Sequence, residues 1–180
     1  NFYTRSKLIK YLKSITFIGY AMPGSILALS LLMTFINTME FFELEWQRYL
    51  TTSILMLLIG FFIRFWGVIQ NVLVSNLEKI SYSQIESAKI LKKKFYSIYK
   101  DILLKEMRPA IISASILLFV ETLKELPLTL LLRPFNFDTL STAVFQLASD
   151  EMVDKSSPFI LIIILFSMLP IVIANRFSDK

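Results

Sequence analysis

The sequence contains no cysteine and no histidine among its 180 residues. Without cysteine there is no disulfide framework from which a redox compartment could be inferred. Without histidine the chain lacks the side chain that most often serves as a general base or a metal ligand. No nucleophile can therefore be paired with a histidine, and no resident metal or catalytic site is expected.

Glycine and charge are also scarce. The only glycines are Gly19, Gly24, Gly60 and Gly67, and none belongs to a Gly-x4-Gly-Lys-Ser/Thr phosphate loop, so the chain has no Walker-type site for hydrolysing ATP. Charged residues make up 18% of the chain and hydrophobic residues 55%, whereas a soluble domain carries about 25% charged residues. The net charge of +5 does not indicate a nucleic-acid partner, because the basic residues do not lie on a soluble scaffold.

Long stretches with few or no charges dominate the rest of the chain. The first, from Ser14 to Met39, contains no charged residue and as a helix would extend about 39 Å, enough to cross a hydrocarbon core of about 30 Å. The pattern predicts an all-α, polytopic membrane protein forming a single domain. The expected transmembrane helices span residues 14–38, 49–71, 109–132 and 156–175.

Basic residues indicate the orientation of these spans. Most lysines and arginines lie before the first span, in the 75–108 loop and in the C-terminal tail. In a four-span arrangement these regions share one side, and the positive-inside rule places that side in the cytoplasm. Both ends of the chain and the 75–108 loop are therefore expected to be cytoplasmic. The chain starts with Asn1 rather than methionine, so we expect it to be part of a longer polypeptide.

Gly19, Pro23 and Gly24 interrupt the apolar pattern of the first span. Proline removes a backbone hydrogen bond and kinks a helix. These residues could form a hinge or a line of close helix contact, or they could simply be tolerated, as glycine and proline often are in membrane helices.

Several charges lie at membrane depth. Glu121, Lys124 and Glu125 share one helical face before Pro127, which is expected to end the helix. Glu121 and Lys124 could neutralise each other, which leaves Glu125 in need of a partner or water. The group could form a gate on a translocation path or a structural ion pair near the outer interface. Arg64, in the second span, is expected to extend to the cytoplasmic interface.

A short helix is predicted after the third span. Asp138 could cap a helix that runs from Thr139 to Ser149, with Leu140, Val144 and Leu147 on its apolar face. We expect an external or re-entrant element near the mouth of the pathway.

The 75–108 segment has a helical pattern rather than the composition of a loop. Ser83 and Glu86 fit a capping box at a helix start, and apolar residues recur beyond it at spacings of three and four. Such a basic amphipathic segment can lie on a membrane surface, pack on its own bundle or bind a cytoplasmic partner.

This segment resembles the EAA loop of ABC importer permeases, whose pattern is Glu-Ala-Ala, a glycine six positions after the glutamate, and later Ile-x-Leu-Pro. The sequence matches at Glu86, Ala88, Ile102 and Leu104 and departs at Ser87, Lys92 and Lys105. Lysine does not adopt a positive φ as freely as glycine, so the turn expected at Lys92 differs from that of the family. The resemblance implies that Ser83, Glu86, Ser87, Ala88, Lys92, Ile102 and Leu104 belong to a loop that couples to an ATPase.

A second resemblance covers a longer stretch. It consists of four short motifs that follow one another in the sequence: Lys124-Glu125-Leu126-Pro127, Leu132-Arg133-Pro134-Phe135, Phe137-Asp138-Thr139-Leu140 and Leu147-Ala148-Ser149-Asp150-Glu151. Together with the segment from Gly19 to Gly24, they resemble the C-terminal part of the second half of ferric-iron-type ABC permeases, which are type-I importers with a MetI-like transmembrane domain.

The resemblance implies a bacterial inner-membrane permease for ferric iron that binds no cofactor itself. ATP would be hydrolysed by a cytoplasmic ATP-binding subunit, cargo would be delivered by a periplasmic substrate-binding protein, and a second permease half or subunit would complete the pathway. Other cargoes remain open: thiamine, polyamine, sulfate or phosphonate. A membrane scaffold that transports nothing, and a secondary transporter or channel that needs no ATPase, also remain open.

Overall fold

The computed structural model describes residues 16–42, 53–80, 96, 100 and 103–178, and every regular element within these ranges is a helix. The all-α prediction is confirmed for this part of the chain. Residues 16–21 are helical, and the longer elements are α2 (Gly24–Phe41), α4 (Ile54–Leu77), α7 (Leu104–Lys124), α8 (Pro127–Leu132), α9 (Leu140–Ser149) and α10 (Val153–Ser178).

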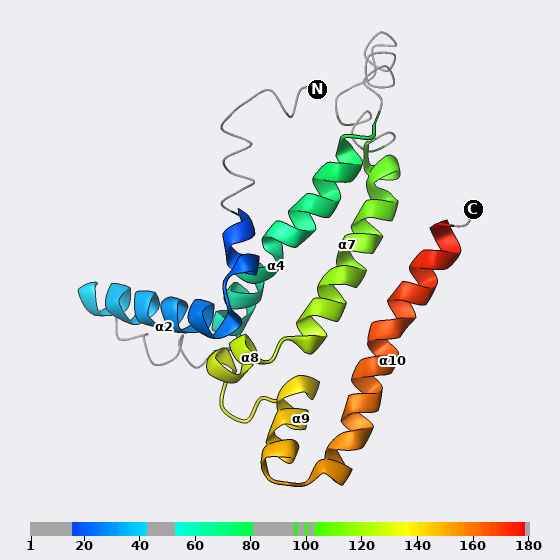
Figure 1. Ribbon diagram of the computed structural model, residues 1–180. Coiled ribbons are helices and arrows are strands. Elements are labelled where there is room, and N and C mark those ends of the chain that lie inside the picture. The colour runs from blue at the N-terminus through cyan, green and yellow to red at the C-terminus, as the bar shows by residue number, and fades with distance from the viewer. Residues whose placement is uncertain (1–15, 43–52, 81–95, 97–99, 101–102, 179–180) are drawn as a thin grey trace.

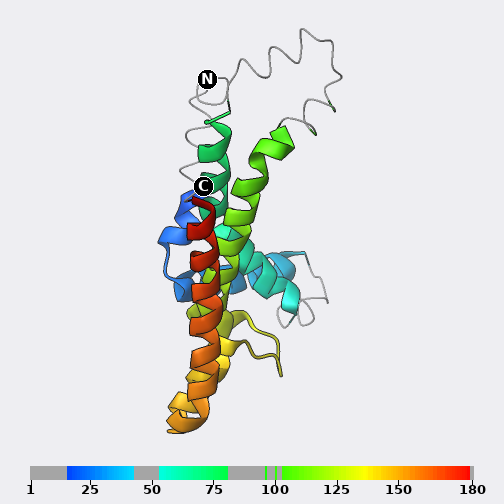
Figure 2. The same cartoon turned by 90° about the vertical axis from the view of Figure 1, so that its right-hand side faces the viewer.

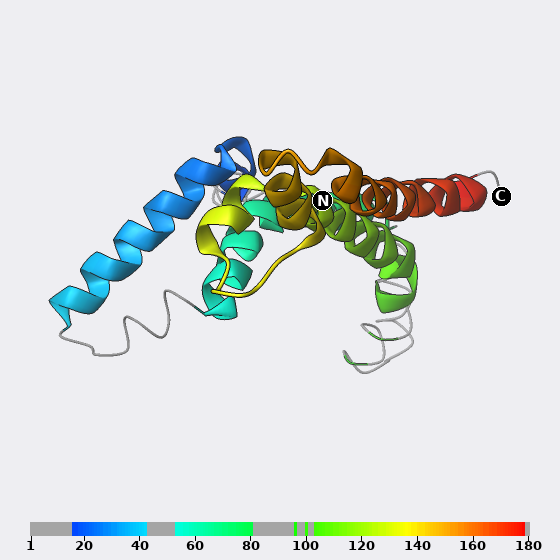
Figure 3. The same cartoon turned by 90° about the horizontal axis from the view of Figure 1, so that it is seen from below.

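Three long helices, α4, α7 and α10, run alongside one another, with α7 in contact with both of the others (Figure 1, Figure 2). The C-terminal ends of α4 and α10 and the N-terminal end of α7 lie at one end of the molecule, while α8 and α9 lie at the other (Figure 1). Helix α2 leaves this group at a steep angle, and most of its length lies apart from the other helices (Figure 1, Figure 3).

A small apolar core forms where α2, α4 and α8 meet. Its buried residues are Leu27 and Ala28 of α2, Met56 and Leu57 of α4, and Leu128 and Leu132 of α8. These side chains come from three segments that are far apart in the sequence, so their burial fixes the base of α2 against α4 and α8 by the hydrophobic effect. The outer face of α2 contributes little to this core, since Leu29 and Met33 are exposed.

Two glycines allow the helix over residues 16–21 to cross α4 at very short range. A Cβ atom added at Gly19 would collide with the carbonyl oxygen of Ile63, and one added at Gly67 would collide with that of Thr16. The hydroxyl of Thr16 donates a hydrogen bond to Oε1 of Gln70 at 2.6 Å beside this crossing. The close-contact interpretation of Gly19 is therefore confirmed, and the contact is with backbone atoms.

The predicted spans relate to the helices in different ways. Among the described residues, α2 and α4 are the two helices long and apolar enough to cross a membrane by length and composition. Helix α4 covers most of the predicted 49–71 span, and α10 contains the predicted 156–175 span. The predicted 14–38 span is not a continuous helix, because it is interrupted at Met22 and Pro23. That there are four spans stays a prediction.

The predicted 109–132 span is also not one helix. Helix α7 begins at Leu104, five residues before Pro109, and ends at Lys124; the separate helix α8 follows. The predicted start, taken from the beginning of the apolar stretch, was too late in the sequence. Lysine, glutamate and arginine are good helix formers, so the helix extends beyond its apolar part toward the N-terminus. The predicted 75–108 loop correspondingly loses its two ends to α4 and α7.

Helix α9 forms where the sequence predicted it, but its N-cap is Thr139 and not Asp138. The Thr139 hydroxyl accepts a hydrogen bond from the backbone of Thr142, and the Thr142 hydroxyl accepts one from the backbone of Thr139, which completes a capping box. Asp138 instead pairs with Arg133 across the preceding loop. Threonine can occupy the N3 position of the box because its hydroxyl accepts a hydrogen bond as glutamate does.

Replacing Thr139 with alanine is expected to destabilise the protein by about 1 kcal/mol, because an N-cap hydroxyl satisfies a backbone donor that nothing else replaces. Thermal unfolding of the purified protein in detergent measures the effect. Ser149→Ala is the matched control, since the Ser149 hydroxyl donates to the Phe145 carbonyl within the exposed last turn of the same helix. Equal melting temperatures for the two variants would contradict the assigned cap.

Candidate functional site at two interrupted helices

The first interruption separates residues 16–21 from α2. Met22 still donates its N–H to the carbonyl of Ile18 at 3.0 Å, but Pro23 has no N–H and takes an extended conformation with φ −56° and ψ 136°. Helix α2 then starts at Gly24 in a new direction. The predicted hinge residues Gly19, Pro23 and Gly24 therefore surround a real break in the helix, although whether it moves stays a prediction.

The second interruption lies between α7 and α8. Glu125 has an extended ψ of 110°, which ends α7 at Lys124, and Pro127 occupies the first turn of α8. Proline is favoured there because its fixed φ suits a helix start and its missing N–H would have had no helical partner. Pro127 was predicted to end the helix; the structure shows that it opens the next one.

The carboxylate of Glu125 joins the two interruptions. Its Oε2 accepts a hydrogen bond from Nε of Arg64 at 2.8 Å, and Nη1 of the same arginine donates to the carbonyl of Met22 at 2.8 Å. Its Oε1 accepts a bond from the backbone N–H of Leu128 at 3.3 Å, in the first turn of α8. Gly24 lies so close to Oε1 that a Cβ atom there would collide with it.

The backbone carbonyl of Glu125 is satisfied by two hydroxyl groups. Thr129 of α8 donates to it at 2.8 Å, and Ser141 of α9 donates to it at 3.1 Å. Glu125 is only 7% exposed, and Thr129 and Ser141 are buried with it. One residue therefore makes polar contacts to α4, α8 and α9.

The sequence suggested that Arg64 extends to the cytoplasmic interface, but the structure shows that it does not. Its side chain is 16% exposed and ends in the ion pair with Glu125. The expectation was wrong because a long cationic side chain moves to water only when no acceptor is nearer, and here a buried carboxylate and a free helix-end carbonyl are both within reach. Sequence reasoning did not include Arg64 among the candidate site residues and missed its pairing with Glu125.

The predicted pair of Glu121 and Lys124 is confirmed. Nζ of Lys124 lies 3.0 Å from Oε1 of Glu121, and both side chains are accessible to solvent, 49% for Lys124 and 24% for Glu121. This pair and the Arg64–Glu125 pair are neighbours in sequence but differ in environment. The exposed pair of Glu121 and Lys124 is accessible to water or a solute. Both carboxylate oxygens of Glu125, in contrast, accept hydrogen bonds from protein groups.

Most residues of the predicted coupling loop lie outside the described residues. These are Ser83, Glu86, Ser87, Ala88, Lys92 and Ile102. Leu104 is described; it is the first residue of α7 and is partly exposed. The role assigned to this loop stays a prediction.

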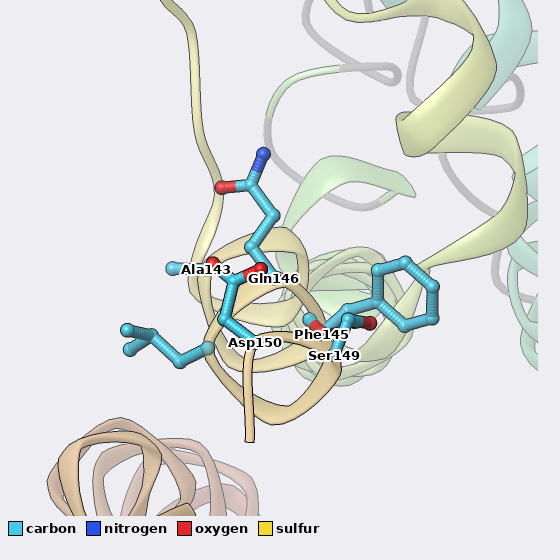
Figure 4. A pocket seen from close by; sticks show the side chains of 6 residues that line it. Ala143, Phe145, Gln146, Ser149 and Asp150 are labelled. Carbon is cyan, nitrogen blue, oxygen red and sulfur yellow. Dashed lines mark hydrogen bonds between the residues drawn. The ribbon is translucent and has the colours of Figure 1, made fainter. Parts of the chain in front are cut away.

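A shallow pocket lies along the exposed side of α9 (Figure 4). It is lined by Ala143, Phe145, Gln146, Leu147, Ser149 and Asp150. Its polar groups are in contact with solvent and none is buried, so it lacks the enclosure that small-molecule sites usually have. Within the described ranges no group of three or more acidic side chains lies close enough to hold a metal ion.

The described part of the chain is all-α, and α2 and α4 are long and apolar enough to cross a membrane. The chain belongs to the family of binding-protein-dependent transport system inner membrane components, which its residues 2–179 match. It is therefore an inner-membrane permease component. It is also 28% identical, over 177 residues, to the Fe(3+)-transport system permease protein FbpB 2 of Haemophilus influenzae; the match covers 98% of this chain and 33% of that protein. The chain thus spans about a third of the length of the curated relative it matches.

Proposed function

We propose that the chain forms part of the membrane-spanning subunit of an ATP-driven importer, and that its cargo is ferric iron. The observation that carries the proposal is the family match over residues 2–179. The cargo rests on the relative described as an Fe(3+)-transport permease. Iron would be the transported substrate, selected by a separate soluble binding protein.

In this proposal both ends of the chain and the 75–108 segment are cytoplasmic. The positive-inside rule gives this orientation. The arrangement of the helices supports it for the 75–108 segment and the C-terminal end, since the ends of α4, α7 and α10 that border them lie at one end of the molecule (Figure 1). Helices α8 and α9 would then lie at the periplasmic end, where a substrate-binding protein delivers cargo.

A cytoplasmic ATP-binding subunit would dock on the 75–108 segment, because the sequence contains no phosphate loop of its own. Closure of two such subunits on ATP would move this segment and, through α4 and α7, shift the helices between outward and inward access. Glu121 and Lys124 would face the translocation path, since their exposed pair leaves charge accessible to a solute. Glu125 and Pro127 would shape the path by fixing the turn between α7 and α8.

Replacing Glu86 with lysine is expected to reduce ATP-dependent uptake strongly while the permease stays in the membrane. The change would remove the acidic half of the predicted capping box and reverse a charge on the proposed docking segment. Uptake of labelled ferric iron into vesicles containing the full-length permease, its ATPase and its binding protein measures the effect.

Glu106→Lys is the matched control for this change. It introduces the same charge reversal at an exposed position in the first turn of α7, near the other end of the 75–108 segment. Normal uptake by the Glu86 variant, or equal losses in both variants, would count against a specific coupling role for Glu86.

Two experiments separate the proposal from its rivals. Purification of the full-length permease should recover a nucleotide-hydrolysing subunit; a permease that transports without one would be a secondary transporter or channel, and one that transports nothing would be a scaffold. Competition of iron uptake by thiamine, polyamine, sulfate and phosphonate tests the cargo. Ferric iron alone should be transported, and competition by another solute would reassign the substrate.

A further inference from the structure

Arg64 donates hydrogen bonds to both halves of the candidate site. Its Nε donates to Oε2 of Glu125 and its Nη1 donates to the carbonyl of Met22, each at 2.8 Å. The first contact reaches the interruption between α7 and α8, and the second reaches the interruption before α2. Helix α4, which carries Arg64, is itself continuous across this region, so it can serve as a fixed support.

The acceptor on Met22 exists because of Pro23. In an unbroken helix the carbonyl of Met22 would accept the N–H of residue 26, four positions later. Beyond the break, α2 starts a new hydrogen-bonding series in which Leu27 donates to the carbonyl of Pro23. The carbonyl of Met22 therefore points out of the end of a helix, where a cation is favoured by both hydrogen bonding and the helix dipole.

The geometry of the two contacts requires arginine. A guanidinium group is a rigid, planar fork whose separate N–H groups can bind a carboxylate and a carbonyl at once. A lysine ammonium is a compact charge at the end of a flexible chain; it could keep the ion pair with Glu125 but would not present two separate donors in one rigid plane to the two acceptors. The two functions of Arg64, charge balance and bridging, can thus be separated by one substitution.

We propose that Arg64 is a positioning residue for transport: it holds the break at Met22–Pro23 and the break at Glu125–Leu126 as one unit, so that α2 and the α7–α8 turn change position together. The proposal rests on the proposed transport function. The carboxylate of Glu125 is fixed between Arg64 and the start of α8, so movement of either broken helix alone would leave a buried polar group unpaired, which is costly in a membrane.

The test uses the full-length permease with its ATPase and binding protein in vesicles. The variants are wild type, Arg64→Lys, and Lys155→Arg as the control, which exchanges the same two residue types at an exposed position in the first turn of α10, outside the candidate site. Uptake, ATP hydrolysis and the amount of assembled complex are measured for each. A single reporter, Ala21→Cys, is placed beside the first break, where this chain has no cysteine of its own, in a permease whose other cysteines have been replaced.

Arg64→Lys is expected to assemble and hydrolyse ATP as wild type does, and to lose about 2- to 30-fold in uptake, the range typical of residues that carry coupling between sites. The difference in maleimide labelling of the reporter between the ATP-free and ATP-trapped states, present in wild type, should become smaller in this variant. Lys155→Arg should match wild type in uptake and labelling.

Two results would overturn the positioning role: wild-type uptake by Arg64→Lys, or an uptake loss that matches a loss of assembled complex, since the residue would then act only on stability. Failure of the wild-type complex to transport with ATP would instead refute the proposed function. The two failures are therefore distinguished within one experiment.

Discussion

Replacing Glu125 with alanine is expected to destabilise the permease by about 3–5 kcal/mol, the usual cost of removing one partner from a buried ion pair. Arg64 would keep its charge in a site where its side chain is 16% exposed. The N–H of Leu128 at the start of α8 would lose its acceptor as well. Thermal unfolding of the full-length permease in detergent, monitored by its size-exclusion profile, measures the loss of stability.

Glu121→Ala is the control for this change, and it should cost about 0–1 kcal/mol because exposed ion pairs contribute little. The double variant Arg64→Leu with Glu125→Leu should recover much of the stability, since well-packed apolar residues can replace a buried pair at little cost. If Glu125→Ala unfolds at the same temperature as Glu121→Ala, the ion pair does not stabilise the fold.

Replacing Gly19 with alanine is expected to destabilise the permease by about 1–3 kcal/mol, the cost typical of overpacking a tight contact. The added Cβ would collide with the carbonyl group of Ile63, and this backbone cannot move without shifting α4. The gain of up to about 1 kcal/mol that alanine brings to a helix does not offset such a clash.

Gly60→Ala provides the matched comparison. Its added Cβ would lie 2.7 Å from Cδ1 of Leu132 and 3.1 Å from Cδ2 of Leu128, and these are the ends of flexible side chains that can rotate away. We expect Gly60→Ala to change the melting temperature much less than Gly19→Ala. The reverse order would show that backbone contact at the crossing is not what limits the size of residue 19.

The local pattern of the sequence predicted much of the fold. Stretches with few or no charges located α4 and α10, and turn and capping chemistry located α9. Pro23 marked a helix break because a missing N–H is a property of the residue itself. The three-residue spacing of Glu121 and Lys124 predicted their pair because helical geometry alone brings them together.

The partner of Glu125 could not be read from local pattern. Arg64 is 61 positions away, on a helix whose rotation about its own axis is set by packing and not by its own sequence. A signal was nevertheless present, since two opposite charges within apolar segments are each costly alone and favour pairing. Matching unpaired charges between predicted spans would have proposed this contact.

The turn at Glu125 also shows how an irregular backbone can exist in a setting with little water. Thr129 and Ser141 both direct their hydroxyls to one peptide oxygen, and so occupy the positions that two water molecules would otherwise take. Side chains of the protein thereby supply the hydrogen bonds that this bend in the backbone needs. A corner built this way does not depend on bound water for its backbone hydrogen bonds, so it can stay folded where water is excluded.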